Sequence, residues 1–202
     1  MHLRPLLALA AALLLSAPAA QAMSVVPPTF PELVAEAESI VRGKVTALRS
    51  AYDETSPGRP IRTYVTFSVE RTLKGTAPTA DSVTLVFLGG TVGSDSLEVA
   101  GMPKFNIGDR EIVFVARNGH TFCPLIGAGH GRYRVLHDAT TQRDYVAREN
   151  RTPLESTTEV ALPLEAPAAA RLKSAARALS PADFETSVLQ ALATPAPAAL
   201  QN

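Results

Sequence analysis

The side chains best suited to chemistry gather in one short stretch of this sequence. His120, Cys123, His130 and His137 fall within eighteen residues, which hold the only Cys of the chain and three of its four His. Imidazole and thiolate are common zinc ligands, and three protein ligands are enough for a catalytic zinc site. A zinc site formed by His120, Cys123 and His130 is therefore the first chemistry to consider.

The expected local structure favours separate roles for these side chains. Along a strand, an odd offset places His120 and Cys123 on opposite faces. His130 lies in the Gly-rich sequence GAGHGR, which suits an imidazole that hydrogen-bonds turn amides, and His137 suits the solvated end of a strand. We therefore keep zinc as an alternative and expect no cofactor.

Cys123 is also a candidate nucleophile, with His120, His130 or His137 as its base. Its neighbours are Phe122 and Pro124, a setting more typical of a small buried apolar side chain. The sequence contains no GxSxG, no HExxH and no phosphate-binding Gly loop, so the usual hydrolase and nucleotide signatures are absent.

Two further polar segments have alternative interpretations. Residues 89–103 are long for a hairpin loop, and they suit a ligand rim, a divalent-cation loop or, the favoured interpretation, a solvated connection containing a short strand. The Asp and Ser spacing there does not match an EF-hand. The second segment contains four arginines with acidic residues among them: Arg132, Arg134, Arg143 and Arg148. This mixture predicts cross-strand ion pairs on a solvated face.

The elements that must position these groups are mostly strands. Apolar and polar residues alternate in residues 39–48 and 62–73, which predicts half-buried strands. Residues 82–88 and 110–117 are apolar on both faces, so we expect both strands at the centre of a sheet. Asn118-Gly119 then predicts a type I′ hairpin turn.

The strand after this turn is expected over residues 120–126, followed by a pair over 132–137 and 144–148. Short strands joined by Gly-containing turns, without helices between them, predict a mainly β, small antiparallel barrel or sandwich.

Helices are expected at both ends of this β region. Thr29 and Glu32 form a capping box before an apolar stripe, and Ser180 with Pro181 begins a second helix. All twelve Gly lie between positions 43 and 131, and the chain after 150 is rich in Ala and Pro. This change of composition divides the chain into a signal peptide (1–22), a barrel domain with its leading helix (23–150), a linker (151–167), a helical segment (168–193) and a disordered tail (194–202).

Residues 1–22 have the layout of a bacterial Sec-type signal peptide. Arg4 precedes an apolar run, and Ala20-Gln21-Ala22 forms a cleavage site before Met23. The run is too short to span a bilayer, so we expect no membrane anchor after cleavage and a periplasmic or secreted protein. The 19 basic and 19 acidic residues argue against a nucleic-acid partner, and a single Cys excludes a disulfide within the chain.

The order of elements resembles the first half of the netrin-like, or TIMP-like, OB-fold superfamily. In that pattern a short helix leads into a strand with G-x-V, the next strand closes with a Lys-Gly turn, and a later strand opens with Gly-Asp. The matching stretches cover about 80 residues: ESIVRGKVTAL, TYVTFSVERTLKG, DSVTLVFLGG and FNIGDREIVFVA. This resemblance implies a small antiparallel OB-like barrel with a short N-terminal helix and a C-terminal helical segment.

The inhibitors of that superfamily chelate a protease zinc through an N-terminal Cys and are crosslinked by disulfides. Here the expected mature chain begins at Met23, and Cys123 has no partner. The inhibitor mechanism therefore does not transfer to any residue. We expect a non-enzymatic exported module that binds an unknown protein or small ligand, with a metal-binding or thiol-dependent enzyme using the region from His120 to His137 as the alternative.

Overall fold

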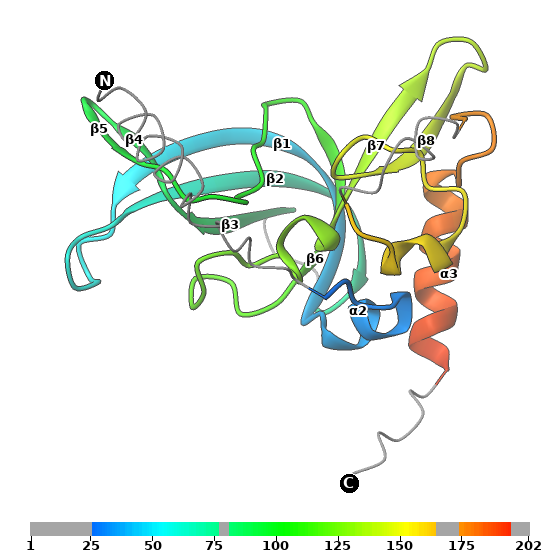
Figure 1. The fold of residues 1–202 in the computed structure, drawn as a ribbon, viewed down its shortest axis with the longest axis horizontal. Coiled ribbons are helices and arrows are strands. Elements are labelled where there is room, and N and C mark those ends of the chain that lie inside the picture. The colour runs from blue at the N-terminus through cyan, green and yellow to red at the C-terminus, as the bar shows by residue number, and fades with distance from the viewer. Residues whose placement is uncertain (1–25, 77–80, 165–173, 195–202) are drawn as a thin grey trace, which may run out of the picture.

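The computed structural model describes residues 26–76, 81–164 and 174–194, and the predicted signal peptide and residues 195–202 of the predicted tail lie outside them. The main body is a six-stranded antiparallel sheet in the order β3-β2-β1-β6-β7-β8 (Figure 1). A separate two-stranded sheet pairs β4 with β5. The predicted mainly β fold is confirmed, and β3 and β8 stand at the two edges of the large sheet. The strands are β1 (Ser39–Tyr52), β2 (Ile61–Lys74), β3 (Ser82–Leu88), β4 (Gly90–Val92), β5 (Asp95–Leu97), β6 (Arg110–Val115), β7 (Arg132–Asp138) and β8 (Arg143–Arg148).

Each face of the large sheet buries its own core, because alternate residues of a strand point to opposite faces. Ile40 belongs to the core on the face that the helices cover, here called the helix-side core. Its neighbour Val41 belongs to the core on the opposite face, called the pocket-side core after the cavity described below. The strand β6 is buried on both faces, as its continuous apolar sequence predicts, and lies between β1 and β7. The pocket-side core consists of Val41, Val45, Val65, Phe67, Leu85, Phe87, Val113, Val115 and Leu125.

The helix-side core is covered by α2 (Phe30–Glu36) and α3 (Pro181–Ala193). It consists of Phe30, Leu33, Val34, Ala37, Ile40, Leu73, Ile112, Phe114, Tyr133, Val135, Val146, Leu154, Val160, Phe184 and Val188. The predicted capping box of α2 is present, since the Thr29 amide donates to the Glu32 carboxylate at 2.8 Å and the Glu32 amide donates to the Thr29 hydroxyl. Ser180 caps α3 by accepting a hydrogen bond from the Asp183 amide. In the stretch predicted as a linker, η2 (Thr157–Ala161) and its neighbour Leu154 pack into this core. Of the described helices, none has both the length and the apolar character needed to cross a bilayer.

Two strand predictions are wrong. The strand β3 lies at an edge of the sheet instead of its centre. Residues 120–126 form turns and an isolated bridge instead of a return strand. Asn118 accepts a hydrogen bond from the Val86 amide and donates one to the Thr84 carbonyl, so its side chain covers the free edge of β3 instead of beginning a return strand.

Candidate functional site

The structure does not bring the predicted metal ligands together. His120 lies exposed in a turn, Cys123 packs against the pocket-side core, and His130 is buried in the short helix η1 (Ala128–Gly131). His137 is largely exposed on β7, where its Nδ1 lies 3.0 Å from the carboxylate of Asp144. Across the three described ranges, no three His, Cys, Asp or Glu side chains are close enough to hold a metal ion.

Cys123 has the surroundings of a structural thiol. Burial raises the pKa of its thiol, and its Sγ contacts the Leu125 carbonyl oxygen at 3.9 Å. A reactive cysteine needs a lowered pKa and a positively charged neighbour, because the thiolate is the nucleophile. This environment does not favour the thiol-dependent alternative.

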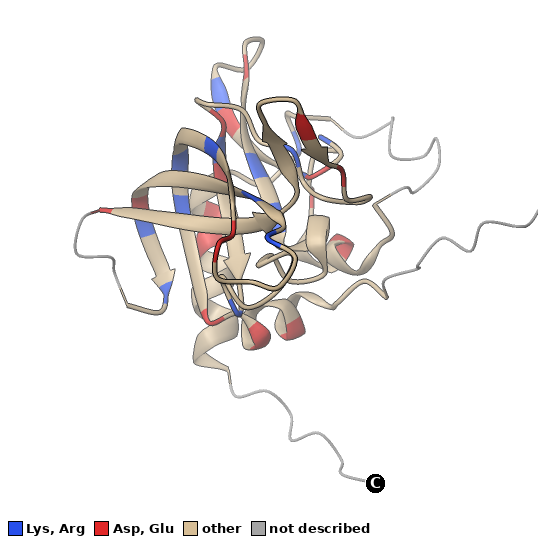
Figure 2. Ribbon diagram, turned by 90° about the vertical axis from the view of Figure 1, so that its left-hand side faces the viewer, with Lys and Arg blue, Asp and Glu red and all other residues tan. Residues whose placement is uncertain are grey.

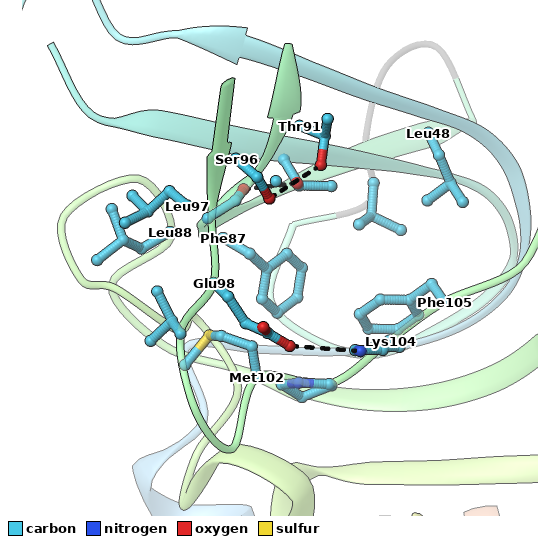
Figure 3. A pocket seen from close by; sticks show the side chains of 16 residues that line it. Leu48, Phe87, Leu88, Thr91, Ser96, Leu97, Glu98, Met102, Lys104 and Phe105 are labelled. Atoms are coloured by element: carbon cyan, nitrogen blue, oxygen red, sulfur yellow. Dashed lines mark hydrogen bonds and ion pairs between the residues drawn. The ribbon is translucent and has the colours of Figure 1, made fainter. Parts of the chain in front are cut away.

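A cavity of about 450 Å³ lies instead between the large sheet and the segment from Gly89 to Phe105 (Figure 3). This volume falls within the range of small-molecule sites. The cavity is open to solvent on one side, and its lining is apolar at the base and polar at the mouth. The lining residues are Leu48, Thr63, Val65, Phe87, Leu88, Gly89, Gly90, Thr91, Ser96, Leu97, Glu98, Val99, Met102, Pro103, Lys104 and Phe105.

The base of the pocket comes from β1, β2 and β3. Leu48, Val65 and Phe87 reach it from three neighbouring strands. Val65 and Phe87 are buried at the same time in the pocket-side core. Val65 and Phe87 therefore belong to both the core and the pocket. Leu48, which is 38% exposed, reaches the same face only three residues after Val45, because the pairing of β1 with β2 shifts register between Val45 and Ala47.

One wall of the pocket is the β4–β5 hairpin, and two glycines allow it to lie close to the sheet. Gly89 and Gly90 have φ angles of 101° and 136°, which favour glycine. A Cβ on Gly90 would overlap the hydroxyls of Ser50 and Thr63. The Thr63 hydroxyl donates to the Gly89 carbonyl at 2.7 Å, so the hairpin is hydrogen-bonded to β2 where it begins.

The other wall, residues 98–105, is attached through Phe105. The ring of Phe105 packs against Phe67 and Phe87, with centroid distances of 5.8 and 5.2 Å. The guanidinium carbon of Arg132 lies 3.9 Å from the centre of the Phe105 ring, a cation–π contact. Arg132 also donates to the Lys104 carbonyl at 2.8 Å, so one arginine holds two consecutive residues of this wall.

Arg132 is held in turn by buried carboxylates. It is fully buried and forms two 2.6 Å hydrogen bonds to Glu111, which is also fully buried. Glu149 lies 2.9 Å from the same guanidinium, and Arg134 joins the cluster through Asp109 and Glu149. Burial raises the pKa of Glu111, and Arg132 opposes that rise.

The predicted solvated face of arginines is therefore wrong for three of its four members, since Arg132, Arg134 and Arg148 are all buried. Arg148 donates to backbone carbonyls around η2, including that of Pro163 at 3.3 Å. Arg143 also donates to backbone carbonyls, those of Ala176 and Ala178. These arginines position loops around the sheet instead of forming a charged stripe in solvent.

The mouth of the pocket carries one acidic and one basic side chain. Glu98 and Lys104 lie 4.0 Å apart, and their side chains are 85% and 90% exposed. They are the only charged residues in the lining, which contains no His and no Cys. Thr63, Thr91 and Ser96 add three hydroxyls to the same lining.

The sequence indicated part of this site. Residues 89–103, for which the sequence favours a solvated connection over a ligand rim, form the hairpin and most of the wall, and the short strand expected at 96–99 overlaps β5. Leu48, Phe105 and Lys104 were not singled out from the sequence. The signal for Lys104 and Phe105 is that the polar connection continues to an aromatic residue before the next strand, and nothing in the sequence distinguishes Leu48 from its neighbours.

No protein-family model matches this chain, and a search of curated proteins finds no match either.

Proposed function

We propose that this chain is a non-enzymatic, exported binding module that holds a small ligand in the pocket beside β4 and β5. The observation that carries the proposal is a preformed cavity of about 450 Å³ with an apolar base, polar walls and a lining that contains no His or Cys. Small-ligand sites typically combine a mostly apolar surface with a few polar groups.

Export is supported by the sequence of residues 1–22, which has the charged start, apolar run and cleavage site of a signal peptide. The absence of a nucleic-acid partner is supported by the balance of charge. Figure 2 shows basic and acidic positions beside one another on the strands, whereas a protein that binds nucleic acid carries a surplus of positive charge.

We also propose that the sheet is an open relative of the OB-like barrel. Two features support this: the long strand β1 pairs with both β2 and β6, and the outer edge of β3 is covered by residues 118–122. The kinship with the netrin-like superfamily is proposed for the fold alone.

Binding of N-phenyl-1-naphthylamine, a neutral apolar fluorophore, tests the proposed function. We expect saturable binding of one molecule per chain. Leu48→Asp should weaken it by about tenfold, because a carboxylate replaces an apolar side chain of the lining. The matched control is Ile107→Asp, which makes the same kind of change at a side chain that is 66% exposed and outside the pocket.

The proposal is contradicted if the fluorophore does not bind the wild-type chain, or if both variants bind it equally well. Thermal unfolding of both variants establishes that each is folded at the temperature of the titration.

A further inference from the structure

The interior of the pocket is suited to an apolar side chain, and in particular to an aromatic one. The rings of Phe87 and Phe105 face the cavity, with their centroids 5.2 Å apart and their planes at 50° (Figure 3). Met102 adds a flexible thioether to the same lining, and sulfur packs well against aromatic rings. Leu48 and Val65 complete the apolar surface.

The hydroxyl groups of the lining already have partners. The Thr63 hydroxyl donates to the Gly89 carbonyl and lies 3.1 Å from the Ser50 hydroxyl. The hydroxyls of Thr91 and Ser96 lie 3.3 Å from each other. Because no charged side chain lines this inner region, a charged part of a ligand has to lie at the mouth.

The mouth carries two opposite charges at short distance. The 4.0 Å separation of Glu98 and Lys104 is at the outer limit of an ion pair, and both groups are exposed to water (Figure 3). A lone carboxylate is attracted by Lys104 but repelled by Glu98, and a lone ammonium meets the reverse combination. Only a ligand that carries both charges a few bonds apart gains an attraction at each side chain.

We infer that the pocket binds a zwitterion with a large apolar side chain, namely a free α-amino acid of the phenylalanine type. The apolar side chain occupies the space between Phe87, Phe105 and Met102. The ligand ammonium faces Glu98 and the ligand carboxylate faces Lys104. This inference rests on the proposed binding function and adds the chemical class of the ligand.

Calorimetric titration with three related probes tests this inference. The probes are L-phenylalanine, phenylethylamine, which lacks the carboxylate, and 3-phenylpropanoate, which lacks the ammonium. We expect L-phenylalanine to bind about threefold to fivefold more tightly than either analogue, since exposed charge pairs contribute modestly. The preference should weaken when salt is added, because salt screens exposed charges.

Two variants assign the charges. Lys104→Gln should remove the preference for L-phenylalanine over phenylethylamine, and Glu98→Gln should remove the preference over 3-phenylpropanoate. Lys44→Gln is the control, because Lys44 is exposed on β1 and does not line the pocket. It should leave both preferences unchanged.

Equal affinities for the three probes, no binding of L-phenylalanine, or preferences unchanged in both mouth variants would overturn the inference. In each case, N-phenyl-1-naphthylamine bound in a way that depends on Leu48 would leave the proposed binding function standing. If that neutral probe also fails to bind, the proposed function is overturned as well.

Discussion

His130 is a buried imidazole whose surroundings disfavour a positive charge. It is 7% exposed, and its Nδ1 has no hydrogen-bond partner within the described part of the chain. Burial lowers the pKa of His130, and the nearby guanidinium of Arg148 lowers it further. These surroundings favour the neutral form of the imidazole in the folded chain.

The lowered pKa of His130 predicts in which direction the free energy of unfolding changes with pH. Between the folded-state pKa and the unfolded value of about 6.5, the unfolded chain binds more protons, so the free energy of unfolding falls as pH decreases through that interval. The slope from this one group is at most about 1.4 kcal/mol per pH unit. Urea titrations at pH 5 and pH 7.5 should show a smaller difference for His130→Gln than for the wild type.

The exposed His120 provides the control for this experiment, because His120→Gln should keep the wild-type dependence on pH. An unchanged pH dependence in His130→Gln would show that another group is responsible.

At the residue scale, the sequence is a poor guide to buried charge. Arg132 and Arg134 alternate with apolar residues on β7, and this pattern predicts a solvated face because arginine is seldom fully buried. The guanidinium of Arg132 can be buried because two carboxylates reach it. Glu111 lies on β6, on one side of β7, and Glu149 follows β8, on the other side. That meeting depends on the register of three strands, which spacing along the chain does not reveal.

At the scale of elements, α3 is joined to the sheet by a buried carboxylate. Glu185 is 1% exposed and accepts hydrogen bonds from Arg42 of β1 at 2.5 Å and Arg71 of β2 at 2.7 Å. Phe184, the preceding residue, packs its ring against Tyr133 with a centroid distance of 4.8 Å. The helix therefore has one ionic and one aromatic attachment to the sheet.

We predict that Glu185→Gln lowers the free energy of unfolding by about 2 kcal/mol, the usual range for hydrogen bonds to a charged group. Both arginines are partly exposed, which allows water to solvate them once the carboxylate is gone. Hydrogen exchange should become faster in α3 than elsewhere. Glu36→Gln, at an exposed position of α2, is the control, and equal exchange in the two variants would contradict this role of Glu185.

Local signals predicted many of the elements well. Capping residues placed the starts of α2 and α3, and alternation placed β1 and β2. The hairpin predicted from Asn118-Gly119 failed because the Asn118 side chain bonds to the edge of β3, a contact 32 or more residues away in the chain. Local propensity contains no information about such long-range contacts.

At the scale of the whole molecule, α3 and the proposed binding site lie at different ends of the sheet. Figure 1 shows β4 and β5 at one end of the sheet and α3 at the other. The helix-side core contains Phe184 and Leu154, whereas the pocket shares Val65 and Phe87 with the pocket-side core. A variant that loosens α3 should therefore keep its affinity for a pocket ligand.

The pocket beside β4 and β5 is the proposed binding site for a ligand. Its most direct test is a titration with N-phenyl-1-naphthylamine followed by amide chemical shifts in ¹H–¹⁵N correlation spectra. We predict that the largest shifts fall on residues 87–91 and 96–105, while the amides of His120, His130 and α3 change little. Largest shifts around His120 to His137, or shifts spread evenly over the chain, would contradict the account.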